Sequence, residues 1–163
     1  MNGGRRHERG QVAVYAVLLF PLLMLVLVLV LAVGSLEDLR SRIGAQLDTA
    51  ALTATQALDP PALAAGQPPR LVPAEADALA REYVARNIAA SGDLVAESPS
   101  AIAAGAQVVV TNVPGVDPLT GLAVTAPTVT IRVQVPARVP LLSVAGIGPV
   151  VTLTLTGSAA ART

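Results

Sequence analysis

The sequence predicts an α+β protein with a single N-terminal transmembrane helix, further helices and a small antiparallel sheet of three to four strands. Three observations lead to this prediction: an uncharged apolar run, a helical apolar stripe that follows it, and period-two alternation near the C-terminus. The 163 residues suffice for one small domain beside the membrane segment. We divide the chain into a basic cytoplasmic segment (1–11), a transmembrane helix (12–35), an amphipathic helix (36–58), a Pro-rich linker (59–73) and an extracytoplasmic α+β domain (74–163).

The apolar run extends from Val12 to Val33 without a charged side chain. At 1.5 Å per residue a helix of this length is about 33 Å long, and the hydrocarbon core of a bilayer is about 30 Å thick. Pro21 would free a backbone carbonyl near the middle, so we expect a kink. A cleaved secretory signal is the alternative, because Ala32-Val33-Gly34 has a small-x-small form. The run is longer than the usual signal core of about 7–15 residues, which favours a retained anchor.

Arginines on the two sides of this run predict its orientation. Arg5, Arg6 and Arg9 precede the run, whereas Arg40 and Arg42 follow it. Basic residues stay on the cytoplasmic side of a membrane. We therefore expect a single-pass protein with its N-terminus inside, its C-terminal domain outside and the lipid bilayer as a partner.

Apolar residues at spacings of three and four continue from Leu36 to Leu58 and predict an amphipathic helix. Gly34-Ser35 is a candidate hinge at the membrane exit. The helix should stop at Asp59, because two prolines follow and disfavour helical backbone in the residue before them. Five prolines between Asp59 and Pro73 predict a stiff, partly extended linker.

A second helix is expected from Pro73 to Ser91, with Glu82 and Arg86 as an i, i+4 pair on its exposed side. The pattern then changes to alternation that is rich in β-branched residues. This alternation predicts strands at 107–111, 128–135 and 151–156, with helices on the apolar face and the Thr-rich faces toward water.

Two connections in the C-terminal part have distinct compositions. Residues 112–127 contain two turn-forming Pro-Gly stretches. Residues 136–149 are unusually apolar for a connection, with Leu141, Leu142, Val144 and Ile147. These side chains either plug the edge of the sheet or contact something outside the domain.

The chain offers little catalytic chemistry. His7 is its only histidine and is placed in the cytoplasm, and cysteine is absent. The exported domain therefore has no Ser–His–Asp triad, no Cys–His pair and no His or Cys metal site. Asp117 is a candidate Ca²⁺ ligand in its loop, and an ordinary turn carboxylate is the alternative. From these missing groups we expect no enzyme, cofactor, metal or small-molecule substrate. The net charge of zero gives no indication of a nucleic-acid partner.

Three stretches carry a resemblance to a known family. They are Arg9-Gly10-Gln11-Val12-Ala13-Val14, Leu18-Leu19-Phe20-Pro21-Leu22-Leu23, and the Gln- and Ala-rich residues 42–54. This pattern resembles the TadE/TadG-like family of Tad (Flp) pilus-assembly proteins, and the C-terminal strands are also similar to its members. The resemblance implies a pilin-like architecture in the bacterial inner membrane, with other pilus or secretion-system proteins as partners.

The chain departs from one branch of this family at Tyr15. In the TadE branch a prepilin peptidase cuts after a glycine, and a glutamate stands five residues beyond the cut. Here the cut would fall between Gly10 and Gln11, and the fifth residue is Tyr15, which carries no negative charge near neutral pH. This difference favours the unprocessed, TadG-like side of the family. A helix boundary at Gly10 and an interfacial aromatic anchor at Tyr15 are the alternative readings.

The small residues from Gly44 to Ala57 have two readings, packing against the domain's own sheet or close helix–helix contact in an assembly. Taken together, the sequence predicts an accessory or minor pilin-like component with a structural role. The alternatives are a processed pseudopilin in a filament and an anchored binding module that recognises a ligand through residues 112–127.

Overall fold

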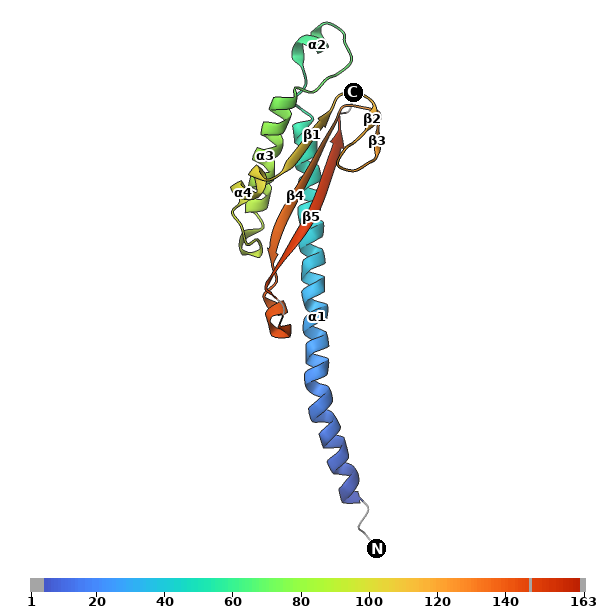
Figure 1. Ribbon diagram of the computed structural model, residues 1–163, viewed down its shortest axis with the longest axis vertical. Coiled ribbons are helices and arrows are strands. Elements are labelled where there is room, and N and C mark those ends of the chain that lie inside the picture. Colours follow the sequence, from blue (N-terminus) through green and yellow to red (C-terminus); the bar gives the residue numbers. More distant parts are fainter. Residues whose placement is uncertain (1–4, 147, 162–163) are drawn as a thin grey trace.

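The computed structural model describes residues 5–146 and 148–161; side chains are described for residue 15 and within 17–161, except at 144, 145 and 147. One long helix carries a small domain along its C-terminal half, and the N-terminal half projects away from that domain (Figure 1). The domain combines further helices with a three-stranded antiparallel sheet. The predicted α+β class is therefore confirmed.

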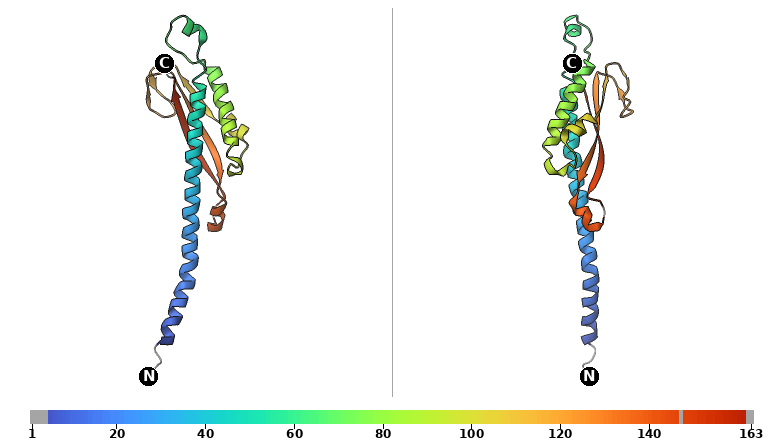
Figure 2. Two further views of the ribbon diagram at one scale, coloured as in Figure 1. Left: turned by 180° about the vertical axis from the view of Figure 1, so that it is seen from behind. Right: turned by 60° about the vertical axis from the view of Figure 1, so that its left-hand side comes forward.

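Helix α1 (Arg5–Ala54) is continuous over 50 residues and includes Pro21. Its N-terminal part is inclined to the rest of the helix (Figure 2). The helix is unbroken at the candidate hinge Gly34-Ser35. Both residues are helical, and the Ser35 hydroxyl donates to the carbonyl of Ala32 at 2.8 Å.

The end of α1 lies at Ala54, not at the predicted Asp59. After the helix the chain pairs with a later segment, since Leu58 forms an antiparallel bridge with Leu71. The amide of Asp59 also donates to the carbonyl of Arg70 at 2.8 Å. This pairing requires extended backbone at residue 58, so a long-range contact ends the helix before the prolines can.

The Pro-rich segment differs from the expected linker because it folds back on itself. It contains helix α2 (Pro60–Ala64), which begins with two prolines after the capping residue Asp59. An Asp59 carboxylate oxygen accepts from the amide of Ala62 at 3.3 Å. Gly66 has a φ of +69°, a left-handed conformation that favours glycine, and it reverses the chain toward Leu71.

Helix α3 (Pro73–Ala89) packs along α1 and ends two residues before the predicted Ser91. The predicted surface pair is confirmed, since Arg86 and Glu82 lie 2.8 Å apart. The buried residues of α3 follow helical spacing, which is why its stripe was readable from the sequence. They are Ala76, Ala80, Val84 and Ile88.

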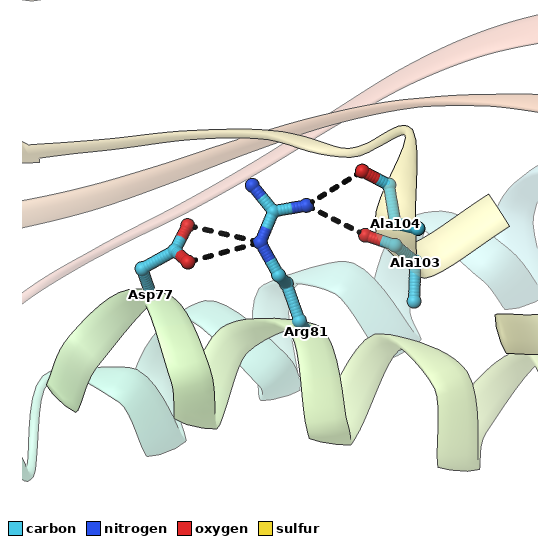
Figure 3. A network of polar contacts seen from close by, with 4 residues as sticks. All are labelled: Asp77, Arg81, Ala103 and Ala104. Atoms are coloured by element: carbon cyan, nitrogen blue, oxygen red, sulfur yellow. Dashed lines mark hydrogen bonds and ion pairs between the residues drawn. The ribbon is translucent and has the colours of Figure 1, made fainter. Parts of the chain in front are cut away.

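Two short helices, η1 (Gly92–Leu94) and α4 (Pro99–Ala104), were not predicted. Six residues are too few to show a helical period. Arg81 of α3 ties α4 in place by donating to the carbonyls of Ala103 and Ala104 at 2.9 and 2.8 Å (Figure 3). Asp77 holds the same guanidinium at 2.9 Å. Arg81 thus donates to carbonyls at the C-terminus of a helix, where hydrogen bonds within the helix run out.

The main sheet has the order β1-β4-β5, with β4 (Thr128–Arg138) between β1 (Gln107–Thr111) and β5 (Val150–Ala160). Both pairings are antiparallel. Strands β4 and β5 extend beyond the predicted ranges because each pairs with the other along its whole length. A separate two-stranded hairpin, β2 (Gly115–Val116) with β3 (Ala123–Val124), forms inside the predicted turn region.

The core lies between α1, α3 and one face of the sheet (Figure 2). Alternate residues of β4 supply the sheet side of this core, as the period-two pattern predicted. They are Val129, Ile131, Val133 and Val135, each no more than 1% exposed. They share one apolar cluster with Ile43 and Leu47 of α1.

The prediction that the Thr-rich faces point to water is wrong for two residues. Thr152, Thr154 and Thr156 of β5 are exposed. In contrast, Thr128 and Thr130 of β4 are buried, because residues 112–127 fold over this face of the sheet.

The apolar connection between β4 and β5 contains a 3₁₀ helix, η2 (Pro140–Ala145), and η2 contacts α1. The amide of Val139 donates to the carbonyl of Pro149 at 2.7 Å and closes the loop. Leu142 is half-buried, whereas Leu141 is 38% exposed. Ile147 lies outside the described residues, as does the side chain of Val144.

Candidate functional surfaces

The N-terminal half of α1 is an apolar cylinder that the domain does not cover. In the described part of this helix, an 18-residue stretch has a mean hydropathy of 3.1, and 6% of this stretch is buried. The helix is long and apolar enough to cross a membrane. Leu22, for example, is 56% exposed and Val30 is 62% exposed. A helix that is apolar on all sides is stable only inside a protein core or a membrane.

The residues predicted for topology and processing lie at the N-terminal end of this cylinder. The backbone is helical at Arg5, Arg6, Arg9, Gly10 and Gln11, and their side chains lie outside the described residues. Topology and processing at these positions therefore stay predictions.

Tyr15, the fifth residue after the candidate cut, lies on α1 and is 62% exposed. No residue of the described domain covers its ring. Its exposure is compatible with contact to lipid or to another protein, and its phenol supplies no carboxylate for pairing with a neighbouring amino group.

The charged residues just beyond the apolar run pair with one another on the surface of α1. Arg42 lies 2.8 Å from Asp38, and Arg40 lies 3.6 Å from Glu37. All four side chains are more than half exposed, so these pairs contribute little to stability. Their consequence is a sharp border on α1 between the apolar cylinder and a polar surface.

Some of the small residues from Gly44 to Ala57 pack inside the domain, as the intramolecular reading expects, whereas Ala45 and Thr49 are exposed. Ala50, Ala51 and Ala54 have no exposed surface. Strand β5 comes so close to helix α1 that a Cβ on Gly157 would lie 2.7 Å from the carbonyl carbon of Leu47. The small side chains of α1 and the glycine of β5 therefore permit one tight helix–strand contact.

Asp117 fastens the loop of residues 112–127 onto the sheet. One of its carboxylate oxygens accepts from the amides of Leu119 and Thr120 at 2.7 and 2.9 Å. The other oxygen accepts from the hydroxyl of Thr130. Burial raises the pKa of the Asp117 carboxyl, but these hydrogen bonds outweigh that effect and hold the pKa below its ordinary value of 3.8.

This geometry favours a structural role for Asp117 over the calcium reading. Both carboxylate oxygens already accept hydrogen bonds, which compete with a cation for their lone pairs. Arg132 further fixes the loop by donating to the carbonyl of Leu119. Among the side chains that the structure describes, no three His, Cys, Asp or Glu residues gather into a metal site.

A hollow of about 460 Å³ lies on the outer face of the sheet beside α4. Its polar lining includes Glu97, Gln107, Arg132 and Gln134. These groups can hydrogen-bond a ligand, but they do not pair a nucleophile with a general base. The hollow therefore has no evident catalytic chemistry.

The sequence analysis missed three residues that organise these surfaces: Gly157, Arg81 and Asn112. The side-chain amide of Asn112 contacts the backbone of Leu71 twice. Its oxygen accepts from the Leu71 N–H at 2.7 Å, and its nitrogen donates to the Leu71 carbonyl at 3.0 Å. A signal existed for Gly157, because an isolated glycine in a strand pattern indicates close approach of another backbone. The spacing of Asp77 and Arg81 likewise indicates an i, i+4 pair. The α4 carbonyls that Arg81 contacts and the Leu71 partner of Asn112 lie 22 to 41 residues away, so no local pattern reveals these contacts.

The hairpin end of the domain presents an exposed apolar surface. Val113 is 70% exposed, Val116 is 66% exposed and Leu122 is 67% exposed. These side chains come from the hairpin and its entry, at the end of the domain that is remote from η2 (Figure 1). Such a group of exposed apolar residues marks a candidate contact surface.

Comparison with known proteins finds a family match in the N-terminal region. Residues 10–67 match the family model described as "Putative Flp pilus-assembly TadE/G-like". The match begins at Gly10, runs through the rest of α1 and ends just after α2, and it confirms the resemblance found in the sequence. No curated protein and no solved structure matches the chain.

Proposed function

Since residues 10–67 are TadE/G-like and connect the chain with Flp pilus assembly, we propose that it is a membrane-anchored accessory or minor pilin-like component of a Tad/Flp-type pilus assembly or secretion system. The role is structural and includes no reaction, cofactor or nucleic acid. The N-terminal half of α1 crosses the inner membrane, and the α+β domain engages other pilus or secretion-system proteins outside it.

One observation carries this proposal. Most of the matched region is one continuous helix, α1, of which the C-terminal half is packed into a domain and the N-terminal half is bare and apolar. A bare apolar half of this length is suited to a bilayer or to a bundle of similar helices. The helix thus links a membrane-embedded segment rigidly to an exported domain.

The orientation follows from arginines at the two ends of the apolar run. Three arginines lie close before the run, and two lie close after it. This distribution supports a cytoplasmic N-terminus.

Tyr15 favours an anchored component over a processed filament subunit. A filament subunit of this type would place a carboxylate near a neighbour's new α-amino group, because a buried charge needs a partner. Tyr15 is exposed on α1 and cannot supply that carboxylate. The intact mass of the protein from the membrane fraction tests this point.

A mass that corresponds to the whole chain, or to the chain without only its initiator Met1, would support the anchored component. A mass that begins at Gln11 would instead indicate a processed pseudopilin. A mass that begins at Ser35 would contradict the membrane anchor itself.

The assembly role is tested in the native host. Deleting the gene should reduce surface pili, and the full chain should restore them. Leu22→Arg should fail to restore them, because an arginine near the centre of a span costs about 3 kcal/mol of insertion. Leu52→Arg is the matched control: Leu52 lies on the same helix and is 53% exposed, against 56% for Leu22. Unchanged pili in the deletion strain would refute the role.

The exposed apolar hairpin favours one second candidate, an anchored binding module. In this reading Val113, Val116 and Leu122 contact a cell-envelope ligand. Changing all three to serine should abolish ligand binding while leaving pili unaffected. Loss of pili in the same variant would return the hairpin to the assembly role.

A further inference from the structure

The segment between β4 and β5 is apolar and makes its polar contacts internally. From Val139 to Pro149 it contains no charged residue. In η2 the amide of Leu142 donates to the carbonyl of Val139 at 3.0 Å, and the hydroxyl of Ser143 donates to the carbonyl of Pro140 at 2.6 Å. Such internal bonds lower the cost of moving a segment out of water.

This segment lies against the end of the bare apolar half of α1. The stripe of α1 that packs into the domain continues backward through Leu36 to Ala32, which is 1% exposed. Val28 and Leu29, one turn earlier, are half-buried, although their neighbours Leu27 and Val30 are exposed. Helix η2 contacts α1 and is the part of the domain nearest to this level (Figures 1 and 2).

The level of η2 can be compared with the limits of the membrane span. The uncharged run ends at Val33, and the first charged residues after it are Glu37 and Asp38. The half-buried Val28 lies five residues before that end, which corresponds to about 7 Å along a helix. An interfacial segment enters the boundary between headgroups and acyl chains to a depth of about 5–10 Å. Helix η2 therefore lies where a membrane-surface segment would lie.

We propose that η2 and its flanks form a second contact with the lipid bilayer, in the interface of the leaflet on the domain's side. Leu141, 38% exposed, and Val150, 47% exposed, enter the interface, and the exposed Arg138 meets lipid phosphates at its border. The contact fixes the height and rotation of the domain relative to the membrane. It rests on the proposed function in one respect, the insertion of α1.

The amino-acid composition provides a direct test, because the chain has no tryptophan. Leu141→Trp would introduce a single fluorophore at the proposed contact, and Val150→Trp would introduce one at the same end of the sheet. The full-length variants would be reconstituted in phosphatidylcholine vesicles with and without brominated acyl chains, which quench tryptophan on contact. Unchanged unfolding transitions would identify the variants that keep the fold.

Two control variants calibrate the measurement. Phe20→Trp lies in the apolar run, and Val113→Trp lies at the hairpin end of the domain. We expect brominated lipid to reduce the emission of Phe20→Trp and Leu141→Trp about twofold or more, and to leave that of Val113→Trp unchanged.

The outcomes separate the two proposals. Quenching of Phe20→Trp without quenching of Leu141→Trp or Val150→Trp would overturn the second contact and leave the anchor intact. Absence of quenching in Phe20→Trp would contradict the anchor of the proposed function. If Leu141→Trp is shielded from aqueous iodide only at high protein density and is not quenched by lipid, a second copy of the chain covers η2 and the proposal is wrong.

Discussion

The two halves of α1 share one uninterrupted helical backbone but have opposite surroundings. In the C-terminal half, Ile43 and Leu47 are buried against the sheet, while Arg40 and Arg42 on the other side are exposed. In the N-terminal half, the side chains from 17 to 27, Leu22 among them, are exposed on every side of the helix. The amphipathic half needs a domain and the uniformly apolar half needs a membrane or a helix bundle, so the period of the apolar residues, not the helix itself, decides the environment.

The largest expected difference between the two halves is in the effect of shortening a leucine. Leu47→Ala should lower the free energy of unfolding of the domain by about 2–5 kcal/mol, because it leaves a cavity at a site that is 1% exposed. Leu22→Ala should change it by less than about 0.5 kcal/mol. Denaturant unfolding of the full chain in detergent micelles would measure both, and equal effects would contradict the division of α1 into two environments.

The contact between α1 and β5 should tolerate no added methyl group. Gly157→Ala would place a Cβ 2.7 Å from the backbone of Leu47, and we expect it to lower the stability of the domain by about 1–3 kcal/mol. Gly44→Ala on α1 is the control, because nothing lies within 4 Å of the added Cβ. It should stabilise the protein by about 0.5–1 kcal/mol. Thermal unfolding that moves in the same direction for both would refute the tight contact.

A pH dependence should be confined to the domain. The pKa of Asp117 is lower in the folded state than in the unfolded chain. Its contribution to stability is therefore complete above the ordinary value of 3.8 and is lost as the pH falls through the folded-state pKa. Asp117→Asn should cost about 1–3 kcal/mol near neutral pH, because hydrogen bonds to a buried group are lost.

The same variant should lose less stability on acidification than the original chain does. Unfolding measured from pH 6 down to about pH 2 would show this as two curves that converge at low pH. Parallel curves would mean that Asp117 does not hold the loop in its charged form.

The smallest expected difference concerns two arginines with similar ion pairs. Arg81→Gln removes an ion pair and two hydrogen bonds to the end of α4, and we expect a loss of about 1 kcal/mol. Arg42→Gln, on α1 just beyond the apolar run, removes only an exposed pair and should cost about 0.3 kcal/mol. Chemical denaturation of the two variants side by side would resolve them, and an equal loss would show that Arg81 does not secure α4.

The sequence predicted those features that depend on local pattern. The apolar cylinder, the stripes of α1 and α3, the Glu82–Arg86 pair and the three strands of the main sheet all follow from composition and periodicity within a few turns or residues. The family resemblance also came from the local pattern around Gly10 and Pro21. Helix α4 was missed because it is too short to display a period.

The candidate surfaces were predicted less completely than the elements. Asp117 was singled out from its loop, but its role as a fastener depends on Thr130, which approaches it only because residues 112–127 fold over the sheet. The apolar connection at 136–149 was recognised as unusual. Its place against α1 required the structure, since the two segments are far apart in the chain.

The sequence by itself determined that this protein has a membrane-length apolar helix, a second amphipathic helix, a threonine-rich antiparallel sheet and a TadE/G-like N-terminal region. Only the tertiary structure decided that α1 ends at Ala54, that Thr130 is buried, that α1 leaves no room for a Cβ at position 157 and that η2 packs against α1. The physical reason is the range of the interactions. Hydrophobic period and turn chemistry act between residues that are close in sequence, whereas helix ends, buried hydroxyls and close backbone contacts are set by partners dozens of residues away.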